Sequence, residues 1–366
     1  MAEYILILLV LFFGLTSVYL LYERYTRRAR AGESSRYIEA LRDLLDGKQE
    51  AAFTKLRQVV TDDSNNIDAY LRLGQILRDH NRPQKALEVH KDLTLRGGLT
   101  RECKIAILRQ LALDYLVLNE LPTAESALKE LLSLDSQNRW AYRYLLNLQE
   151  KELKWDDAYD TAARLLKLES NKSKKPLARF KYYAGLQLYR KREYHKARVV
   201  MKEAIGLDPT YVQAYLTIGD SYYDEKRFED AVNFWSKLIS VVPEQGHQVI
   251  DRLKKTLFEL GRYGDIMEIC QDILKHDPKN LGARRAVAEF YEKKGEADAA
   301  AETFEEIIED FPDDYASLME LIRYYLEKGD RKKLDELLRS LEKKQDTRKR
   351  LPLDKSVDSA PVGSQS

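Results

Sequence analysis

The sequence predicts an all-α protein in which one N-terminal transmembrane helix precedes a right-handed α-solenoid of about nine helical hairpins. Three observations indicate this class: an uncharged apolar run near the N-terminus, small residues that recur about every 34 positions, and few Gly and Pro. A chain of 366 residues with 33% charged residues, 16 Gly and 9 Pro is typical of helix-rich bodies with charged outer faces.

Charge and cysteine content exclude several classes of function. Lys and Arg total 61 and Asp and Glu total 60, which leaves a net charge of +1. Because nucleic-acid affinity comes mainly from neutralised phosphates, we expect no nucleic-acid partner. Cys103 and Cys270 are distant and form no CxxC pair, so they indicate neither a disulfide scaffold nor a zinc ribbon, and they favour a reducing compartment.

The apolar run predicts a membrane anchor over residues 1–23. Residues 4–22 carry no charge, and at about 1.5 Å per residue a helix of this length spans about 29 Å, close to a bilayer core. A cleaved signal peptide is the alternative. It would begin with basic residues and end at a small-x-small site, whereas this start is acidic at Glu3 and Leu20-Leu21-Tyr22-Glu23 offers no such site.

The flanking charges predict the orientation of the anchor. No Lys or Arg precedes the run, and four arginines lie in the linker at residues 24–33: Arg24, Arg27, Arg28 and Arg30. The positive-inside rule then places the long C-terminal body in the cytoplasm. Alternatively, these arginines only bind lipid headgroups, but that role also favours the anionic cytoplasmic leaflet.

Self-similarity predicts the repeat fold of residues 34–345. One position of the pattern is occupied by Ala52, Ala86, Ala124, Ala158, Ala197, Ala231, Ile266, Ala300 and Leu334, at spacings of 34, 38, 34, 39, 34, 35, 34 and 34. Twelve residues earlier, several units carry a second small residue: Ala40, Gly74, Ala112, Gly185, Gly219 and Ala288. Closing prolines follow in four units, at Pro209, Pro243, Pro278 and Pro312. This is the pattern of tetratricopeptide repeats, each a pair of antiparallel helices.

Helix packing explains these residue types. Two antiparallel helices approach closely only where small side chains meet, and stacking of pairs buries a continuous apolar core. Larger residues fill the next layer, predicted at Leu56, His90, Leu128, Met201, Trp235, Cys270, Phe304 and Leu338. Glycines are expected in the turns between paired helices at Gly47, Gly261, Gly295 and Gly329. Ile266 and Leu334 break the small-residue rule, so their pairs are expected to splay or to cap the stack.

Two insertions and the C-terminal end depart from the regular spacing. Residues 96–102 are read as a turn with Thr100 as a helix N-cap. Residues 171–176 form a basic loop, which is either a long connection or a contact for an acidic partner or anionic lipid. Residues 342–350 are charged and residues 351–366 are rich in Pro, Ser and Gly without periodicity, and we expect a disordered tail over residues 346–366.

No catalytic, cofactor or metal site is predicted. The five histidines fall in different repeats without ligand spacing, and no GxSxG, HExxH, P-loop or dinucleotide-binding pattern occurs. His90 and Cys270 sit at core positions and are read as packed residues rather than ligands. The acidic pairs at residues 156–157 and 313–314 precede helices, where carboxylates favour the helix N-terminus. An enzyme would need a constellation across repeats that the sequence does not show.

A concave groove lined by the first helix of each pair is the remaining candidate site. In the repeat frame its predicted partner-binding residues are Arg78, Arg109, Arg143, Asn147, Arg179, Tyr182, Tyr189 and Tyr223, with Arg323 further along. Arg forks bind carboxylates and Tyr supplies rigid contact area, and both are common at binding hot spots. The alternative is an ordinary polar groove without a fixed ligand. The interspersed acids Asp220, Asp251 and Glu289 argue against a purely anionic ligand.

The first three units resemble a known family. Tyr37 and Leu44-Leu45 lead into Ala69-Tyr70-Leu71-x-Leu73-Gly74-x-x-x-Arg78; Val89-His90-x-x-Leu93, Leu99-Thr100-x-Glu102 and Leu111-x-x-Asp114-Tyr115 follow. This order is similar to that of the lipopolysaccharide assembly protein B family of bacterial inner-membrane proteins, over roughly residues 4 to 345.

The resemblance implies a single-pass inner-membrane adaptor whose repeats face the cytoplasm. In the family, the repeats bind the deacetylase of lipid A synthesis and present it to a membrane-bound AAA+ protease. The family also carries a C-terminal rubredoxin-like module with two CxxC pairs, and this sequence contains none, so no zinc is predicted. The alternative function is a general membrane-anchored scaffold or co-chaperone that binds peptide segments in secretion or complex assembly.

Overall fold

The computed structural model describes Tyr19 and residues 35–339. The predicted anchor at residues 4–22, apart from Tyr19, lies outside these residues, as do the arginines that follow it and the predicted tail at residues 346–366. Among the helices that the structure does describe, none is both long enough and apolar enough to cross a bilayer. The chain divides into two compact units, with the boundary between Ser173 and Lys174. We call residues 35–173 the first body and residues 174–339 the second body.

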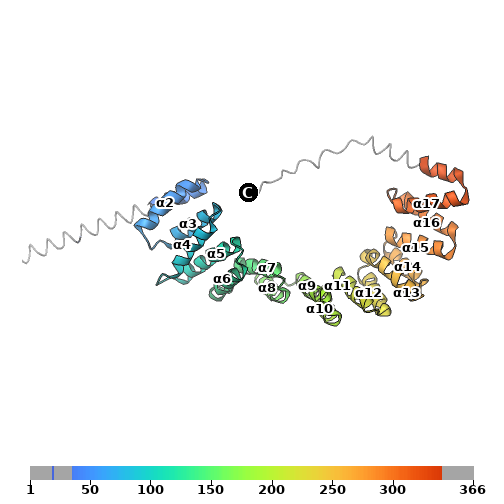
Figure 1. Cartoon of the computed structure of the whole chain (residues 1–366), viewed down its shortest axis with the longest axis horizontal. Helices are drawn as coiled ribbons and strands as arrows, with labels where there is room; N and C mark the ends of the chain where they lie inside the picture. The colour runs from blue at the N-terminus through green and yellow to red at the C-terminus, as the bar shows by residue number, and fades with distance from the viewer. Residues whose placement is uncertain (1–18, 20–34, 340–366) are drawn as a thin grey trace, which may run out of the picture. The chain divides into compact units, whose positions relative to one another are not determined.

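The first body is a stack of four helix pairs (Figure 1). A helical segment over residues 35–45 pairs with the first of its named helices. Those helices are α2 (Gln49–Asp62), α3 (Ile67–Asp79), α4 (Pro83–Thr94), α5 (Arg101–Val117), α6 (Leu121–Leu134), α7 (Arg139–Lys151) and α8 (Trp155–Leu168).

The second body continues with five pairs and two short 3₁₀ segments. Its elements are η1 (Lys175–Leu177), α9 (Ala178–Arg190), α10 (Tyr194–Leu207), α11 (Val212–Asp224), α12 (Phe228–Val241), η2 (Pro243–Val249), α13 (Ile250–Glu259), α14 (Asp265–His276), α15 (Leu281–Lys294), α16 (Ala297–Asp310) and α17 (Tyr315–Lys328). A helical segment over residues 331–339 pairs with α17. No strand occurs in the described part of the chain, so the predicted all-α repeat architecture of nine helix pairs is confirmed.

Local sequence sets where the helices begin and end. Asn66, Asn138 and Asn280 occupy the same place before three first helices, and each side chain accepts a bond from a backbone N–H at 3.0 Å. Thr100 caps α5 in the same way, as predicted, accepting from Cys103 N at 3.2 Å. Asp314 likewise caps α17. The four predicted turn glycines all adopt positive φ, between +67° and +82°, which a glycine reaches without steric cost.

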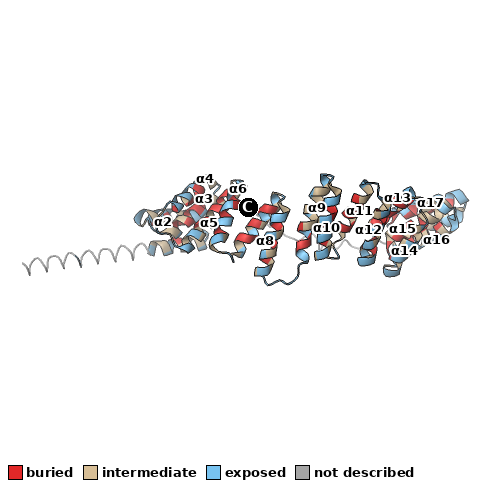
Figure 2. Ribbon diagram, turned by 90° about the horizontal axis from the view of Figure 1, so that it is seen from below, coloured by how far each residue is buried: buried red, intermediate tan, exposed pale blue. Residues whose placement is uncertain are grey.

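The core of each body lies between the helices, along the stripe that every helix turns toward its neighbours (Figure 2). The small residues at both repeat positions are fully or almost fully buried, including Ala52, Ala86 and Ala300. The predicted larger layer is buried from Leu56 to Phe304. Leu338 is an exception at 42% exposed, because no further described pair packs beyond the last segment. Ile266, although large, is fully buried in the core of the second body.

A close helix approach in the second body lies between α11 and α12. Trp235 on α12 lies across Gly219 on α11, and its Nε1 donates to Leu216 O at 3.2 Å. A Cβ atom built on Gly219 collides with the indole ring. The pair can therefore close only if this position lacks a side chain.

We expect Gly219→Ala to destabilise the second body by about 1–3 kcal/mol, because the methyl group overpacks a filled core. Chemical denaturation followed by far-UV circular dichroism would measure the change. Gly206→Ala in α10 is the matched control: nothing lies within 4 Å of its Cβ position, so the greater helix propensity of Ala should stabilise by about 0.5–1 kcal/mol. Equal effects of both changes would contradict the packing argument.

A polar cluster is buried between the second and third pairs. Asp114 on α5 is fully buried and accepts from Arg78 Nη1 on α3 at 2.7 Å. Its other oxygen lies 2.5 Å from His90 Nδ1 on α4, and His90 Nε2 lies 3.2 Å from Leu71 O. His90 is fully buried, so its reading as a core residue is confirmed. Three helices are thus joined by one carboxylate.

Asp114→Asn should cost about 3–5 kcal/mol of folding stability, because it leaves the buried guanidinium without its counter-charge. Urea denaturation monitored by tryptophan fluorescence gives this free energy. Asp92→Asn on exposed α4 surface serves as the control, with an expected change within about 0.5 kcal/mol. A loss for Asp114→Asn no larger than for the control would rule out a structural role for the cluster.

Candidate partner-binding surface

The predicted groove residues all lie on first helices of their pairs. In the first body, Arg78 lies on α3, Arg109 on α5, and Arg143 and Asn147 on α7. In the second body, the remaining four lie on two neighbouring helices: Arg179, Tyr182 and Tyr189 on α9, and Tyr223 on α11. Each predicted groove residue therefore lies on a first helix, four of them in each body.

Arg109 and its surroundings form the best-defined surface of the first body. A cleft of about 380 Å³ lies between α3, α5 and the start of α7, lined in part by Leu71, Ile105 and Arg109. The Arg109 side chain is exposed, and its guanidinium lies 4.6 Å from the centre of the Trp140 ring. Trp140 packs in turn on Tyr144, with ring centres 4.4 Å apart. Stacking fixes the plane of the guanidinium while its N–H groups stay accessible.

Arg143 and Asn147 extend this surface along α7. Both side chains are exposed, and they lie one turn apart. Arg143 Nη2 donates to Glu169 Oε1 at 2.8 Å, with 65% of the arginine side chain exposed. An exposed pair of this kind contributes little stability, so a partner can exchange it at small cost. Arg109, Trp140 and Arg143 together are named the arginine–tryptophan surface below.

Arg78 is placed differently from the other arginines of the first body. Only 10% of its side chain is exposed, and the guanidinium is held by Asp114 and by Gln110 Oε1 at 2.8 Å. It therefore holds α3 against α5 and presents little surface to a partner.

The tyrosines of the second body are engaged with one another and with acids. Tyr182 packs on Tyr211, with ring centres 5.3 Å apart. Tyr189 OH donates to Asp224 Oδ2 at 2.6 Å, and burial together with that carboxylate raises the pKa of Tyr189 above its usual range. The Tyr223 ring has Lys255 Nζ 5.1 Å from its centre. Half-buried rings with their hydroxyls near charged groups make a rigid, polar surface.

The acids that the sequence placed in this groove are largely paired. Arg252 binds Asp220 with two bonds, at 2.7 and 3.2 Å, while burial raises the pKa of Asp220. Lys254 joins Asp251 at 3.1 Å and Glu289 at 2.6 Å. Each of these acids therefore already has a basic partner.

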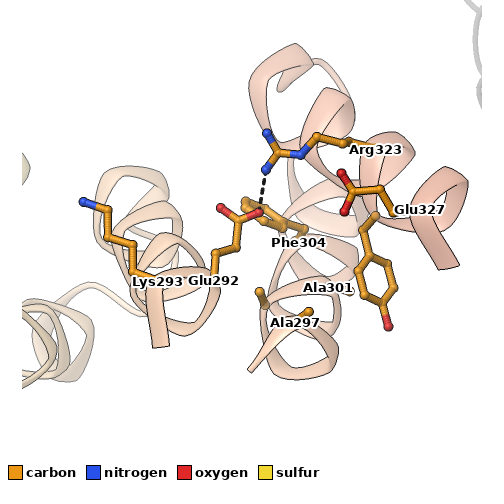
Figure 3. Close-up of a pocket in the computed structure, with 9 residues that line it drawn as sticks. Glu292, Lys293, Ala297, Ala301, Phe304, Arg323 and Glu327 are labelled. Atoms are coloured by element: carbon orange, nitrogen blue, oxygen red, sulfur yellow. Dashed lines mark hydrogen bonds and ion pairs between the residues drawn. The ribbon is translucent and has the colours of Figure 1, made fainter. Parts of the chain in front are cut away.

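Arg323, the candidate nearest the C-terminus, lines a separate cleft of about 400 Å³ between α15, α16 and α17 (Figure 3). Its Nη2 lies 2.9 Å from Glu292 Oε1 and 2.5 Å from a Glu320 oxygen. Burial and the neighbouring Glu320 raise the pKa of Glu292. The guanidinium is thus shared by two carboxylates. Figure 3 shows it pointing toward Glu292.

Sequence reasoning missed Trp140, the aromatic partner of Arg109. Its signal was available, because Trp140 precedes Arg143 by three residues on α7 and so shares a helix face with it. Cys270 is fully buried, as predicted, and burial raises the pKa of its thiol to about 12. Within the described residues, no three His, Cys, Asp or Glu side chains are grouped as metal ligands.

Several known proteins are similar to this chain. The tetratricopeptide repeat family matches residues 257–330. A solved tetratricopeptide repeat protein from Parabacteroides merdae covers 79% of this chain and 97% of its own, at 14% identity and a TM-score of 0.36.

Two curated relatives share the name lipopolysaccharide assembly protein B. The protein from Escherichia coli (strain K12) is 22% identical over 264 residues, which is 72% of this chain and 68% of the relative. The protein from Haemophilus influenzae is 24% identical over 247 residues, which is 66% of this chain and 61% of the relative. The resemblance predicted from the sequence is thereby confirmed: the chain is a tetratricopeptide-repeat protein similar to the lipopolysaccharide assembly protein B family.

Proposed function

We propose that this chain is a membrane-tethered protein-interaction scaffold that acts in lipopolysaccharide assembly. The name of its relatives supports a role in lipopolysaccharide assembly, and the tetratricopeptide repeat fold supports a role in binding other proteins. The observation that carries the proposal is the arginine–tryptophan surface, where the exposed Arg109 stacks on Trp140 and the exposed Arg143 follows Trp140 by three residues on α7. Such a surface suits recognition of another protein and offers nothing to a chemical step.

The chemistry of this surface favours a partner segment with carboxylates beside apolar side chains. Arg forms paired, charge-assisted bonds with carboxylates, and an arginine already stacked on a ring loses less side-chain entropy on binding. The adjoining cleft supplies apolar contacts from Leu71, Ile105 and Ala106. Arg72 in the same cleft is paired with Asp68 at 2.8 Å, whereas Arg109 stacks on Trp140, so Arg109 is the stronger site for a new carboxylate.

The tether is the apolar run at residues 4–22, followed by the basic linker at residues 24–33. In this arrangement the repeats of residues 34–345 face the cytoplasm, and the tail of residues 346–366 follows them. The charge asymmetry across the run supports this orientation. The bacterial inner membrane is the proposed location because of the resemblance to the family.

The proposed client is the deacetylase of lipid A synthesis, presented to a membrane-bound AAA+ protease. Support for these partners is the family resemblance and the acid-binding character of the first body. A scaffold that holds both proteins raises the local concentration of one near the other and needs no catalytic residue.

A more general scaffold or co-chaperone remains the second candidate. The second body favours it: its Tyr-rich face carries Asp220, Asp224 and Lys255 together, and so presents both signs of charge. Mixed charge with rigid rings suits peptide segments of varied sequence.

We expect the double change Arg109→Ala and Arg143→Ala to weaken binding of the purified deacetylase about tenfold or more, because two charge-assisted bonds are lost. The full chain in detergent micelles, immobilised for surface plasmon resonance, gives the dissociation constant. Raising the salt concentration should weaken the wild-type complex and affect the double variant less.

Arg57→Ala provides the matched control, since Arg57 is exposed on α2, a second helix, away from the surface. Unchanged binding by the double variant would remove the arginine–tryptophan surface from the proposal. If the chain binds unrelated carboxyl-terminal peptides tightly and does not bind the deacetylase, the result would favour the general scaffold.

A further inference from the structure

A second cleft in the first body lies between second helices rather than first helices. It holds about 370 Å³ and is bordered by α6 on one side and α8 on the other, with α7 between them. Tyr142, Leu145 and Gln149 of α7 form its floor, and these residues are only 5%, 4% and 2% exposed. None of the predicted groove residues lines it.

The floor of this cleft contains a buried polar atom without a hydrogen-bond partner among the described residues, the amide oxygen Oε1 of Gln149. A buried amide oxygen normally has a partner, because leaving it unpaired costs free energy. Apolar side chains lie beside it in the cleft: Tyr142 and Leu145 on the floor, and Leu132 on the α6 side. A single unpaired acceptor on an otherwise apolar floor is the pattern of a binding pocket.

The charges on the rim indicate what the pocket accepts. Asp157 and Asp160 lie three residues apart on α8, both exposed, and neither pairs with a base in the described chain. Lys129 on the opposite rim is already bound to Glu125 Oε1 at 2.6 Å. Arg164 is the remaining base, so the unpaired rim charges sum to minus one (two Asp against one Arg).

We propose that this cleft binds an arginine side chain of a protein partner. A guanidinium carries five donors in a planar fork, enough to satisfy the Gln149 amide oxygen and a carboxylate of α8 together. The arginine stem would lie on Leu132 and Leu145, as long cationic side chains commonly do on apolar surface. A lysine ammonium is a compact, strongly hydrated charge and matches this geometry less well.

The test is a titration of the full chain in detergent micelles with N-acetyl-argininamide, followed by saturation-transfer difference NMR. The arginine probe should bind saturably, about tenfold more tightly than N-acetyl-lysinamide or N-acetyl-leucinamide. Gln149→Met keeps the side-chain volume and removes the acceptor, and it should weaken the arginine probe about tenfold. Its melting temperature should be no lower than that of the wild type, because an unpaired buried acceptor is lost.

Asp157→Asn combined with Asp160→Asn changes only exposed groups and should weaken the probe similarly if Gln149→Met fails to fold. Asp156→Asn is the matched control, an exposed neighbour that does not line the cleft. Absence of saturable binding would mean that water alone occupies the cleft, which overturns the proposal. Equal affinity for the lysine probe, or equal loss in the Asp156→Asn control, would overturn the assignment to arginine.

Discussion

The closeness of the two helices within a pair is the constraint on which the rest of the structure depends. In three pairs a glycine of the first helix faces a bulky side chain of the second: Gly74 meets His90, Gly185 meets Met201, and Gly219 meets Trp235. A Cβ on any of these glycines would overlap the facing side chain. Removing one side chain lets the opposite one cross the interface, and the helices gain contact along their whole length.

That close approach also decides how neighbouring pairs are joined. Because Gly74 leaves room for the His90 ring, the ring reaches across to Asp114 of the next pair. Other interfaces have their own polar links: Lys154 reaches Glu125 at 2.6 Å, and Arg198 reaches Glu225 at 2.7 Å. Apolar stacking alone would tolerate sliding between pairs, whereas a buried carboxylate with two partners is satisfied in one arrangement. Such links fix the register of the stack.

The repeat could be predicted from sequence because its cause is local and periodic. Small residues about 34 apart, turn glycines and the Thr100 cap all lie where the pattern placed them. The spacing says less about irregular pairs. At the two repeat positions that are small in most pairs, the seventh pair carries Lys254 and Ile266. This pair also contains the 3₁₀ segment η2 and the short helix α13. The repeat spacing alone does not predict η2 or the shortening of α13.

The candidate sites were less predictable, because a side chain's availability depends on residues distant in sequence. Arg78 and Arg109 lie on successive first helices, yet Arg78 is held by the buried Asp114 and Arg109 lies exposed on Trp140. Gln149 is one of several polar residues on α7, and only the packing of α6 and α8 around it leaves its amide unpaired.

The consequence for a scaffold is a division of surfaces between the two helices of each pair. First helices carry the arginine–tryptophan surface, and second helices border the Gln149 cleft, so the two sites share no lining residue. A partner on one surface therefore does not have to displace a partner on the other. Both sites contact α7, at Trp140 and Arg143 on one face and at Gln149 on another. Because the packing of α7 positions lining residues of both sites, a substitution that shifts this helix is expected to disturb the two sites together.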